Sequence, residues 1–182
     1  MLGRRVTERG VKTKEVDLRT HTLFVCTTCK VSKREDAPSP VQDGAQPTPT
    51  GPEMFRRIVE RLWIRGDHPN GLESVDIDKA YEFVAPGGDA VLRVQPQKCL
   101  NACRKANCVA VSHPTKYQYH FSMLHADSAE DIEDLVKFVD FYCQTDGDAF
   151  TKKADRPPRL ATNLISRLPP PLRKDDAHPE AE

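Results

Sequence analysis

The chain has 182 residues, enough for one domain of ordinary size and short for two. Lys and Arg together number 27, as do Asp and Glu, so the formal net charge is zero, which argues against a dedicated nucleic-acid binder. Only 38% of the residues are hydrophobic and 15 are proline, so we expect a small core with disordered or loop-rich extensions. The apolar runs are too short to span a bilayer and no secretory signal is recognisable, which predicts a cytoplasmic protein without membrane contact.

The first third of the chain alternates between polar stretches and two candidate elements. Residues 1–20 are polar and basic without a clear period, which predicts a disordered tail. Residues 22–26 are typical of a short buried strand. Prolines recur through residues 33–52 and predict a flexible loop. Apolar residues then repeat at helical spacing until Gly66, which predicts a helix over about 53–65.

The middle of the chain predicts three strands. Residues 67–89 are ambiguous, with a weak helix around 76–84 as one interpretation. Residues 90–94 are typical of a second strand. Residues 108–111 and 117–121 flank a short turn and predict a hairpin.

The last predicted helix has a clear start. Ser128 with Asp131 resembles an N-terminal capping box, and an apolar stripe follows, which predicts a helix over about 129–143. The remaining residues, 146–182, contain several prolines and predict an extended segment.

The predicted order is strand, helix, strand, strand, strand, helix. A right-handed crossover would make the first two strands parallel neighbours, and the hairpin would complete a four-stranded mixed sheet. We therefore expect an α/β domain over residues 21–145, with two main helices and the minimal thioredoxin-like arrangement.

Six cysteines are the most informative feature of the sequence. Without a secretory signal, metal ligands or redox groups are a better first interpretation than a disulfide framework. Two close pairs stand out, with two and three residues between their members. The six are Cys26, Cys29, Cys99, Cys103, Cys108 and Cys143.

The predicted topology gives the two pairs a common position. Cys26 and Cys29 follow the first strand, whereas Cys99 and Cys103 follow the second. If these strands are parallel neighbours, both pairs emerge at the same edge of the sheet and four thiolates can converge. Four thiolates suit a [2Fe–2S] cluster or a tetrahedral zinc ion, and the spacing alone discriminates only weakly between them.

These residues resemble two known groups of proteins. Residues 99–103, Cys-Leu-Asn-Ala-Cys, resemble the second ligand pair of thioredoxin-like [2Fe–2S] ferredoxins and of the small flavoprotein-associated subunit of respiratory NADH dehydrogenase. A closer resemblance, over roughly residues 22–171 without the proline-rich loop and part of 67–89, is to a bacterial family of uncharacterised proteins labelled predicted metal-binding. It is carried by residues 23–29, 99–103, Cys108, 117–119, the helix ending near Tyr142, 146–147, 156–157 and 167–170.

The resemblance implies a thioredoxin-like fold and a bound metal, but no assigned reaction. In the ferredoxins the gap within the first cysteine pair is longer than the two residues between Cys26 and Cys29. Cys108 matches the closer family, so Cys29 and Cys108 stay open as alternatives for one ligand position.

Three other residue patterns have competing interpretations. The sequence Cys26-Thr27-Thr28-Cys29 also fits a thiol–disulfide oxidoreductase, but such a dithiol wants a helix that starts at its second cysteine, and a proline-rich loop follows instead. His113 and His120 on the hairpin are alternative zinc ligands. Cys143, beside the apolar stripe of the last helix, is interpreted as a core residue.

We therefore expect a thioredoxin-like ferredoxin that transfers single electrons to a redox partner protein. Its [2Fe–2S] cluster would be held by Cys26, Cys29, Cys99 and Cys103, with Cys108 as the substitute ligand. A zinc or other transition-metal binding or carrier protein is the alternative, and a thiol–disulfide oxidoreductase is the third interpretation. No nucleophilic triad, phosphate loop or His-Glu-x-x-His motif is present, so an electron carrier or metal-binding protein is favoured over an enzyme. A homodimer is kept open.

Overall fold

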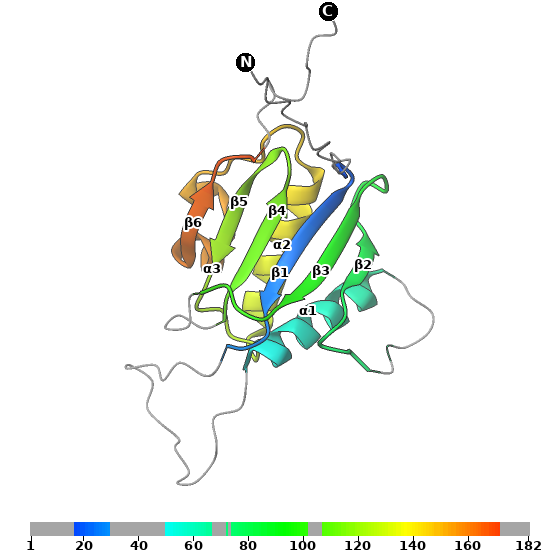
Figure 1. Ribbon diagram of the computed structural model, residues 1–182. Helices are drawn as coiled ribbons and strands as arrows, with labels where there is room; N and C mark the ends of the chain where they lie inside the picture. The colour runs from blue at the N-terminus through cyan, green and yellow to red at the C-terminus, as the bar shows by residue number, and fades with distance from the viewer. Residues whose placement is uncertain (1–16, 30–49, 67–71, 73, 102–106, 172–182) are drawn as a thin grey trace, which may run out of the picture.

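The computed structural model describes residues 17–29, 50–66, 72, 74–101 and 107–171, and they form a six-stranded mixed sheet with helices packed against it (Figure 1). The strands follow the order β2-β3-β1-β4-β5-β6 across the sheet. Their bounds are Thr20–Cys26 for β1, Tyr81–Val84 for β2, Val91–Gln97 for β3, Val109–His113 for β4, Lys116–Phe121 for β5 and Leu164–Leu168 for β6.

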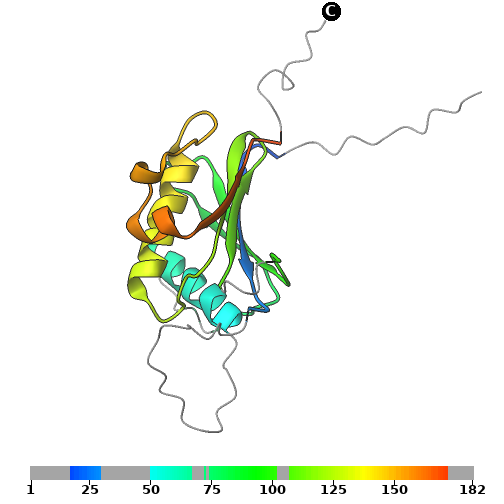
Figure 2. The same cartoon turned by 90° about the vertical axis from the view of Figure 1, so that its left-hand side faces the viewer.

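Two long helices, α1 (Thr50–Arg65) and α2 (Ala129–Gln144), lie on the same face of the sheet (Figure 2). Each buries the apolar stripe that its sequence predicts, because residues three and four apart share one side of a helix. The Ser128 side chain accepts a hydrogen bond from the Asp131 backbone N–H at 3.2 Å and so begins α2 where the capping pattern predicts. The side chains that form the core between the helices and the sheet include Leu23, Val25, Phe55, Ile58, Leu92, Val94, Tyr119, Leu135 and Tyr142.

The predicted arrangement of the four central strands is confirmed. β1 pairs with β3 in parallel, from Thr20 opposite Val91 to Cys26 opposite Gln97. On its other side β1 pairs with β4 in antiparallel orientation, and β4 forms the hairpin with β5. The carboxyl ends of β1 and β3 therefore meet at one edge of the sheet.

The prediction of a four-stranded sheet is wrong, because two short edge strands extend it. β2 lies in the region around residues 76–84 for which a weak helix is one interpretation of the sequence, and it pairs with β3 in antiparallel orientation. β6 lies in the segment predicted to be extended without regular structure, and it pairs with β5. β2 has only four residues and no residue of β6 is fully buried, so any alternation in these strands is too short or too weak to be recognised in the sequence.

The helices also differ in detail from their predicted bounds. α1 begins at Thr50 rather than near residue 53, because Gly51 and Pro52 are part of its first turn, where proline lacks only an N–H that needs no partner. The C-terminal part of the chain adds the 3-10 turn η2 (Lys153–Asp155) and the short helix α3 (Pro158–Thr162).

Most of the predicted disordered segments lie outside the described residues, namely 1–16, 30–49 and 172–182. Among the helices of the described part, none has the length and apolar character needed to cross a membrane.

Candidate metal centre

The loops that follow β1 and β3 are fastened to each other at the edge of the sheet. The Thr27 backbone N–H donates to the Gln97 carbonyl at 2.8 Å, and the Thr28 hydroxyl donates to the Lys98 carbonyl. The Cys26 thiol lies 3.8 Å from the same Lys98 carbonyl. The two cysteine-bearing loops are thus neighbours, as the parallel pairing predicts.

Three cysteine side chains pack together at this edge, in a group that we call the cysteine cluster: Cys26, Cys29 and Cys108. They are 2%, 3% and 2% exposed, respectively, and the partly buried Leu100 packs against them. Cys108 belongs to the cluster because it immediately precedes β4, the antiparallel neighbour of β1, and its carbonyl accepts a hydrogen bond from the Cys26 N–H at 3.0 Å.

The other predicted ligand pair is only partly described. Cys99 lies two residues beyond the end of β3, on the loop fastened to the cysteine cluster, and its side chain is exposed. Its sulfur accepts a hydrogen bond from the Asn101 N–H at 3.2 Å, and Asn101 has a left-handed backbone with a φ of 57°. Cys103 lies outside the described residues. The assignment of Cys99 and Cys103 as ligands therefore stays a prediction.

Within the cysteine cluster, Cys29 has an altered acidity. The hydrogen bond to Cys108, together with burial, raises the pKa of Cys29 well above its usual range, and the weaker contact with Cys26 opposes this shift. Cys29 is therefore a thiol at neutral pH. A metal bound here must displace that proton, because cysteine binds metals as the thiolate.

The N-terminus of α1 packs directly on the loop between Cys26 and Cys29. The Gly51 N–H donates to the Cys29 carbonyl at 3.1 Å. A β-carbon at Gly51 would lie 3.0 Å from the Cys29 nitrogen and still closer to the Cys26 carbonyl oxygen, so only glycine is accommodated without a shift. The sequence predicts no helix N-terminus near Cys29, because a proline-rich segment follows this residue. That prediction is wrong, because α1 lies far from Cys29 along the chain but contacts it in space. The N-terminus of α1 thus faces the backbone of the loop, with the Gly51 N–H bonded to a carbonyl oxygen.

Cys108 is held from its other side by a buried asparagine. The backbone N–H and the side-chain amide of Asn107 both donate to the Leu124 carbonyl, at 3.4 Å and 2.9 Å. Asn107 is buried, so these hydrogen bonds fix the chain that enters the cysteine cluster. No sequence motif marks this contact, because Leu124 lies in the loop between β5 and α2.

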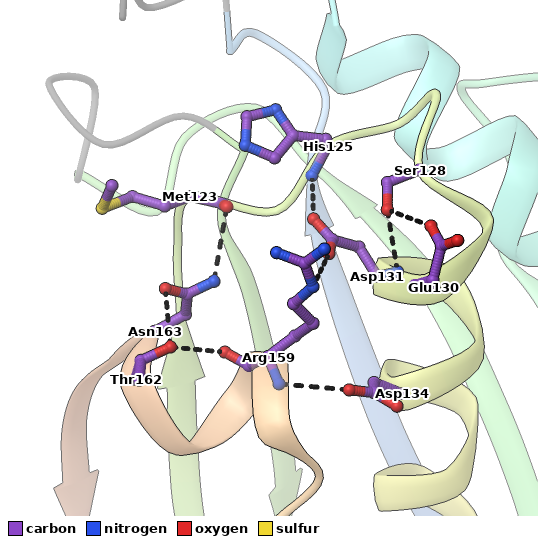
Figure 3. A network of polar contacts seen from close by, with 9 residues as sticks. All are labelled: Met123, His125, Ser128, Glu130, Asp131, Asp134, Arg159, Thr162 and Asn163. Atoms are coloured by element: carbon purple, nitrogen blue, oxygen red, sulfur yellow. Dashed lines mark hydrogen bonds and ion pairs between the residues drawn. The ribbon is translucent and has the colours of Figure 1, made fainter. Parts of the chain in front are cut away.

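That loop is braced by the C-terminal part of the chain (Figure 3). The Asn163 side-chain amide donates to the Met123 carbonyl at 3.4 Å. The carboxylate of Asp131, which is 1% exposed, accepts a hydrogen bond from the His125 N–H at 2.7 Å and pairs with Arg159 at 3.3 Å. Residues around α3 thereby support the loop on which Asn107 and Cys108 rest.

The remaining candidates lie away from the cysteine cluster. His113 ends β4, at the opposite end from Cys108; its Nε2 donates to the Leu18 carbonyl at 3.0 Å and its ring stacks on His21 at 4.3 Å. His120 pairs with Ala110 in the sheet. Cys143 is buried in the main core, as predicted, and burial raises its pKa to about 12.

The donor set suits a metal held by thiolates, since sulfur ligands select zinc, copper(I) and iron–sulfur groups. Within the described ranges, no three or more His, Cys, Asp and Glu side chains are already arranged to hold a metal ion. The cysteine cluster supplies the right donors, packed against one another, and Cys29 must lose its proton before it can bind a metal.

Comparison with known proteins gives one structural and one family match. A solved structure, described as a thioredoxin-like [2Fe-2S] ferredoxin from Aquifex aeolicus, is 17% identical, with 85% of this chain and 98% of that chain covered and a TM-score of 0.39. No curated protein matches. Residues 82–170, from β2 to just past β6 and including Cys99, Cys103, Cys108 and Cys143, match the model of DUF1636, a protein family of unknown function.

Proposed function

We propose that the protein binds a metal group through cysteine thiolates at the carboxyl ends of β1 and β3, and that this group is a [2Fe–2S] cluster used for one-electron transfer. The observation that carries the proposal is the cysteine cluster, in which Cys26, Cys29 and Cys108 meet from two separate segments of the chain. Three buried cysteines at one sheet edge, beside the loop that carries Cys99, form a donor set that an ordinary core does not need.

The ligands would come from both loops. Cys26 is common to every arrangement, and either Cys29 or Cys108 stands beside it. Cys99 and Cys103, which follow β3 in the sequence, would complete four thiolates. When bound, such a cluster accepts and releases single electrons at a potential set by hydrogen bonds to sulfur and by solvent exposure. Three features of the chain would affect that potential. Cys99 is exposed to solvent, and its sulfur accepts a hydrogen bond from the Asn101 N–H. The N-terminus of α1 contacts the loop that carries Cys26 and Cys29.

A single zinc or other transition-metal ion is the second candidate. Three cysteine side chains packed in one cluster favour it, because a tetrahedral ion needs only one further ligand. In that arrangement Cys99 or Cys103 would supply the fourth sulfur.

A thiol–disulfide oxidoreductase is the third candidate. The helix N-terminus against Cys26-Thr27-Thr28-Cys29 favours it. The raised pKa of Cys29 opposes it, because the thiolate is the attacking species in disulfide exchange.

The three candidates differ in metal content and colour. The protein should be purified without oxygen and its visible absorption, iron, zinc and acid-labile sulfide measured. The proposal predicts brown protein with about two irons per chain that is bleached reversibly by one-electron reduction. Colourless protein with about one zinc per chain would contradict the [2Fe–2S] proposal and support the second candidate, a single bound metal ion. Metal-free protein that reduces disulfides, with activity lost in Cys26→Ser, would establish the third.

A further inference from the structure

A groove of about 590 Å³ lies between α1 and the first half of α2. Most of the surface that lines it belongs to apolar atoms, to which Ile64, Ala126, Ala129 and Ile132 contribute among polar and charged residues. Ile64 is 71% exposed. Exposed apolar surface bordered by charged side chains is characteristic of binding sites for other proteins.

The cationic side chains along the groove are all ion-paired, but they share their carboxylate partners. Arg57 pairs with Glu53 at 2.9 Å on the same helix. Arg61 reaches across from α1 to Glu133 on α2 at 2.9 Å, and Lys137 lies 4.0 Å from the same carboxylate. Glu53 also pairs with Arg56, so these two carboxylates do not cancel every cation, but the groove lining as a whole carries five carboxylates against three cations.

The carboxylates along the groove are in excess. Four of them have no ion-pair partner within the part of the chain that the structure describes: Glu60, Asp127, Glu130 and Asp134. Hydrogen bonds from its own backbone N–H and from the Ser128 hydroxyl lower the pKa of Glu130, so this carboxylate stays ionised at neutral pH. The groove therefore combines an apolar lining with a negative rim.

Both walls of the groove begin next to the cysteine cluster. α1 starts at Thr50, its second residue Gly51 bonds to Cys29, and Arg57 follows Gly51 about 9 Å further along the helix axis. α2 follows the loop whose Leu124 carbonyl holds Asn107, the residue before Cys108. An occupant of the groove would thus lie beside the candidate metal centre.

We infer that this groove binds a basic amphipathic helix of a protein partner. Apolar side chains spaced three and four residues apart would enter between α1 and α2, and lysines or arginines on their flanks would face the four carboxylates. That the partner exchanges electrons with this protein rests on the proposed function; the binding itself does not.

The test uses a synthetic helical peptide of about 18 residues, five turns long, with leucines along one face and lysines elsewhere. The full chain, labelled with nitrogen-15, is titrated with it, and amide chemical shifts are followed by NMR. The inference predicts shifts centred on residues 57–64 and 126–137, and affinity that falls with added salt. A matched peptide with glutamates in place of the lysines should not bind.

Charge-reversal variants separate the groove from the overall charge. Glu60→Lys with Asp127→Lys should weaken peptide binding about tenfold or more. Asp78→Lys with Asp89→Lys makes the same charge change at exposed positions outside the groove and should leave binding close to that of the unmodified protein. Equal weakening in both double variants, shifts elsewhere on the molecule, or no binding of the basic peptide would overturn the inference.

Metal content, measured on the same samples, keeps the two proposals apart. Loss of peptide binding in protein that retains its metal counts against the groove alone. Peptide binding by protein that never holds a metal counts against the proposed function alone.

Discussion

Gly51 is placed where its lack of a side chain decides the path of a neighbouring loop. The first turn of α1 touches the backbone of Cys26 and Cys29, and the contact leaves no room for a β-carbon. The neighbouring atoms are backbone, which cannot swing aside as a flexible side chain does. Close packing here is what brings the helix N-terminus to the cysteine pair.

Gly51→Ala should therefore distort the loop between Cys26 and Cys29. We expect the free energy of unfolding to fall by about 1–3 kcal/mol, as for overpacked sites, and metal binding to weaken. Urea denaturation and metal content measure the two effects. Arg57→Ala, on the exposed side of the same helix, should change both far less. A Gly51→Ala protein as stable as the unmodified chain would show that the contact is not tight.

His21 is the second residue whose surroundings determine its chemistry. It is 4% exposed, and neither ring nitrogen has a hydrogen-bond partner among the described residues. His113 stacks on it, and Lys116, whose ammonium donates to the Tyr142 and Cys143 carbonyls, lies nearby. Burial, followed by the positive charge of Lys116, lowers the pKa of His21 to about 3.

Stability should consequently fall in acid. The pKa of His21 is lower in the folded state than its usual 6.5, so the unfolded chain binds more protons between about pH 3 and 6.5. In this window the free energy of unfolding should drop by up to about 1.4 kcal/mol per pH unit from this group. His113 and His120, whose pKa values are also lowered by burial, act in the same direction.

His21→Phe removes the titrating group and keeps a flat ring in the core. We expect a shallower loss of stability between pH 6.5 and 4.5 in urea denaturation than for the unmodified chain, with little difference near pH 8. Identical slopes for both proteins would mean that His21 becomes protonated without cost in the folded state.

Among the elements, the short helix α3 holds the start of α2 in place through Arg159. Its Arg159 side chain neutralises the buried Asp131 carboxylate in the first turn of α2, and its backbone N–H donates to Asp134 at 3.1 Å. A buried carboxylate without a partner is costly, whereas exposed ion pairs contribute little.

Arg159→Met keeps most of the side-chain length and removes the charge. We expect a loss of about 1–3 kcal/mol in the free energy of unfolding. Arg57→Met, which breaks only the exposed pair with Glu53, should cost no more than about 0.5 kcal/mol. Chemical denaturation of the two variants compares them directly, and equal losses would contradict a bracing role for Arg159.

The elements differ in how far their sequences predict them. α2 could be placed well, because Ser128 caps it and its apolar stripe spans four turns. The start of α1 was predicted three residues late, because Gly51 and Pro52 resemble a loop until the contact with Cys29 explains the glycine. β2 and β6 were missed, since the hydrogen bonds of their neighbours β3 and β5, rather than their own patterns, make them strands.

At the scale of the whole molecule, the order of the strands determines where the cysteines lie. The parallel pairing of β1 with β3 follows from the order of elements, and it brings the two cysteine-bearing loops together. The entry of Cys108 into the cluster could not be derived from spacing, because it depends on β4 lying antiparallel beside β1. The support from Asn107, Leu124 and the residues around α3 joins segments far apart in the sequence, with no motif to mark it.

The central claim is that the cysteine cluster is a metal centre rather than a group of core thiols. Metal content of Cys26→Ser and Cys143→Ser, purified side by side without oxygen, tests it most directly, because Cys26 is a ligand in every proposed arrangement. Both cysteines are buried, but only Cys26 packs against Cys29 and Cys108. The account predicts that Cys143→Ser retains the metal of the unmodified protein and that Cys26→Ser loses most of it. Equal metal content in the two variants, or none in the unmodified protein, would contradict the account.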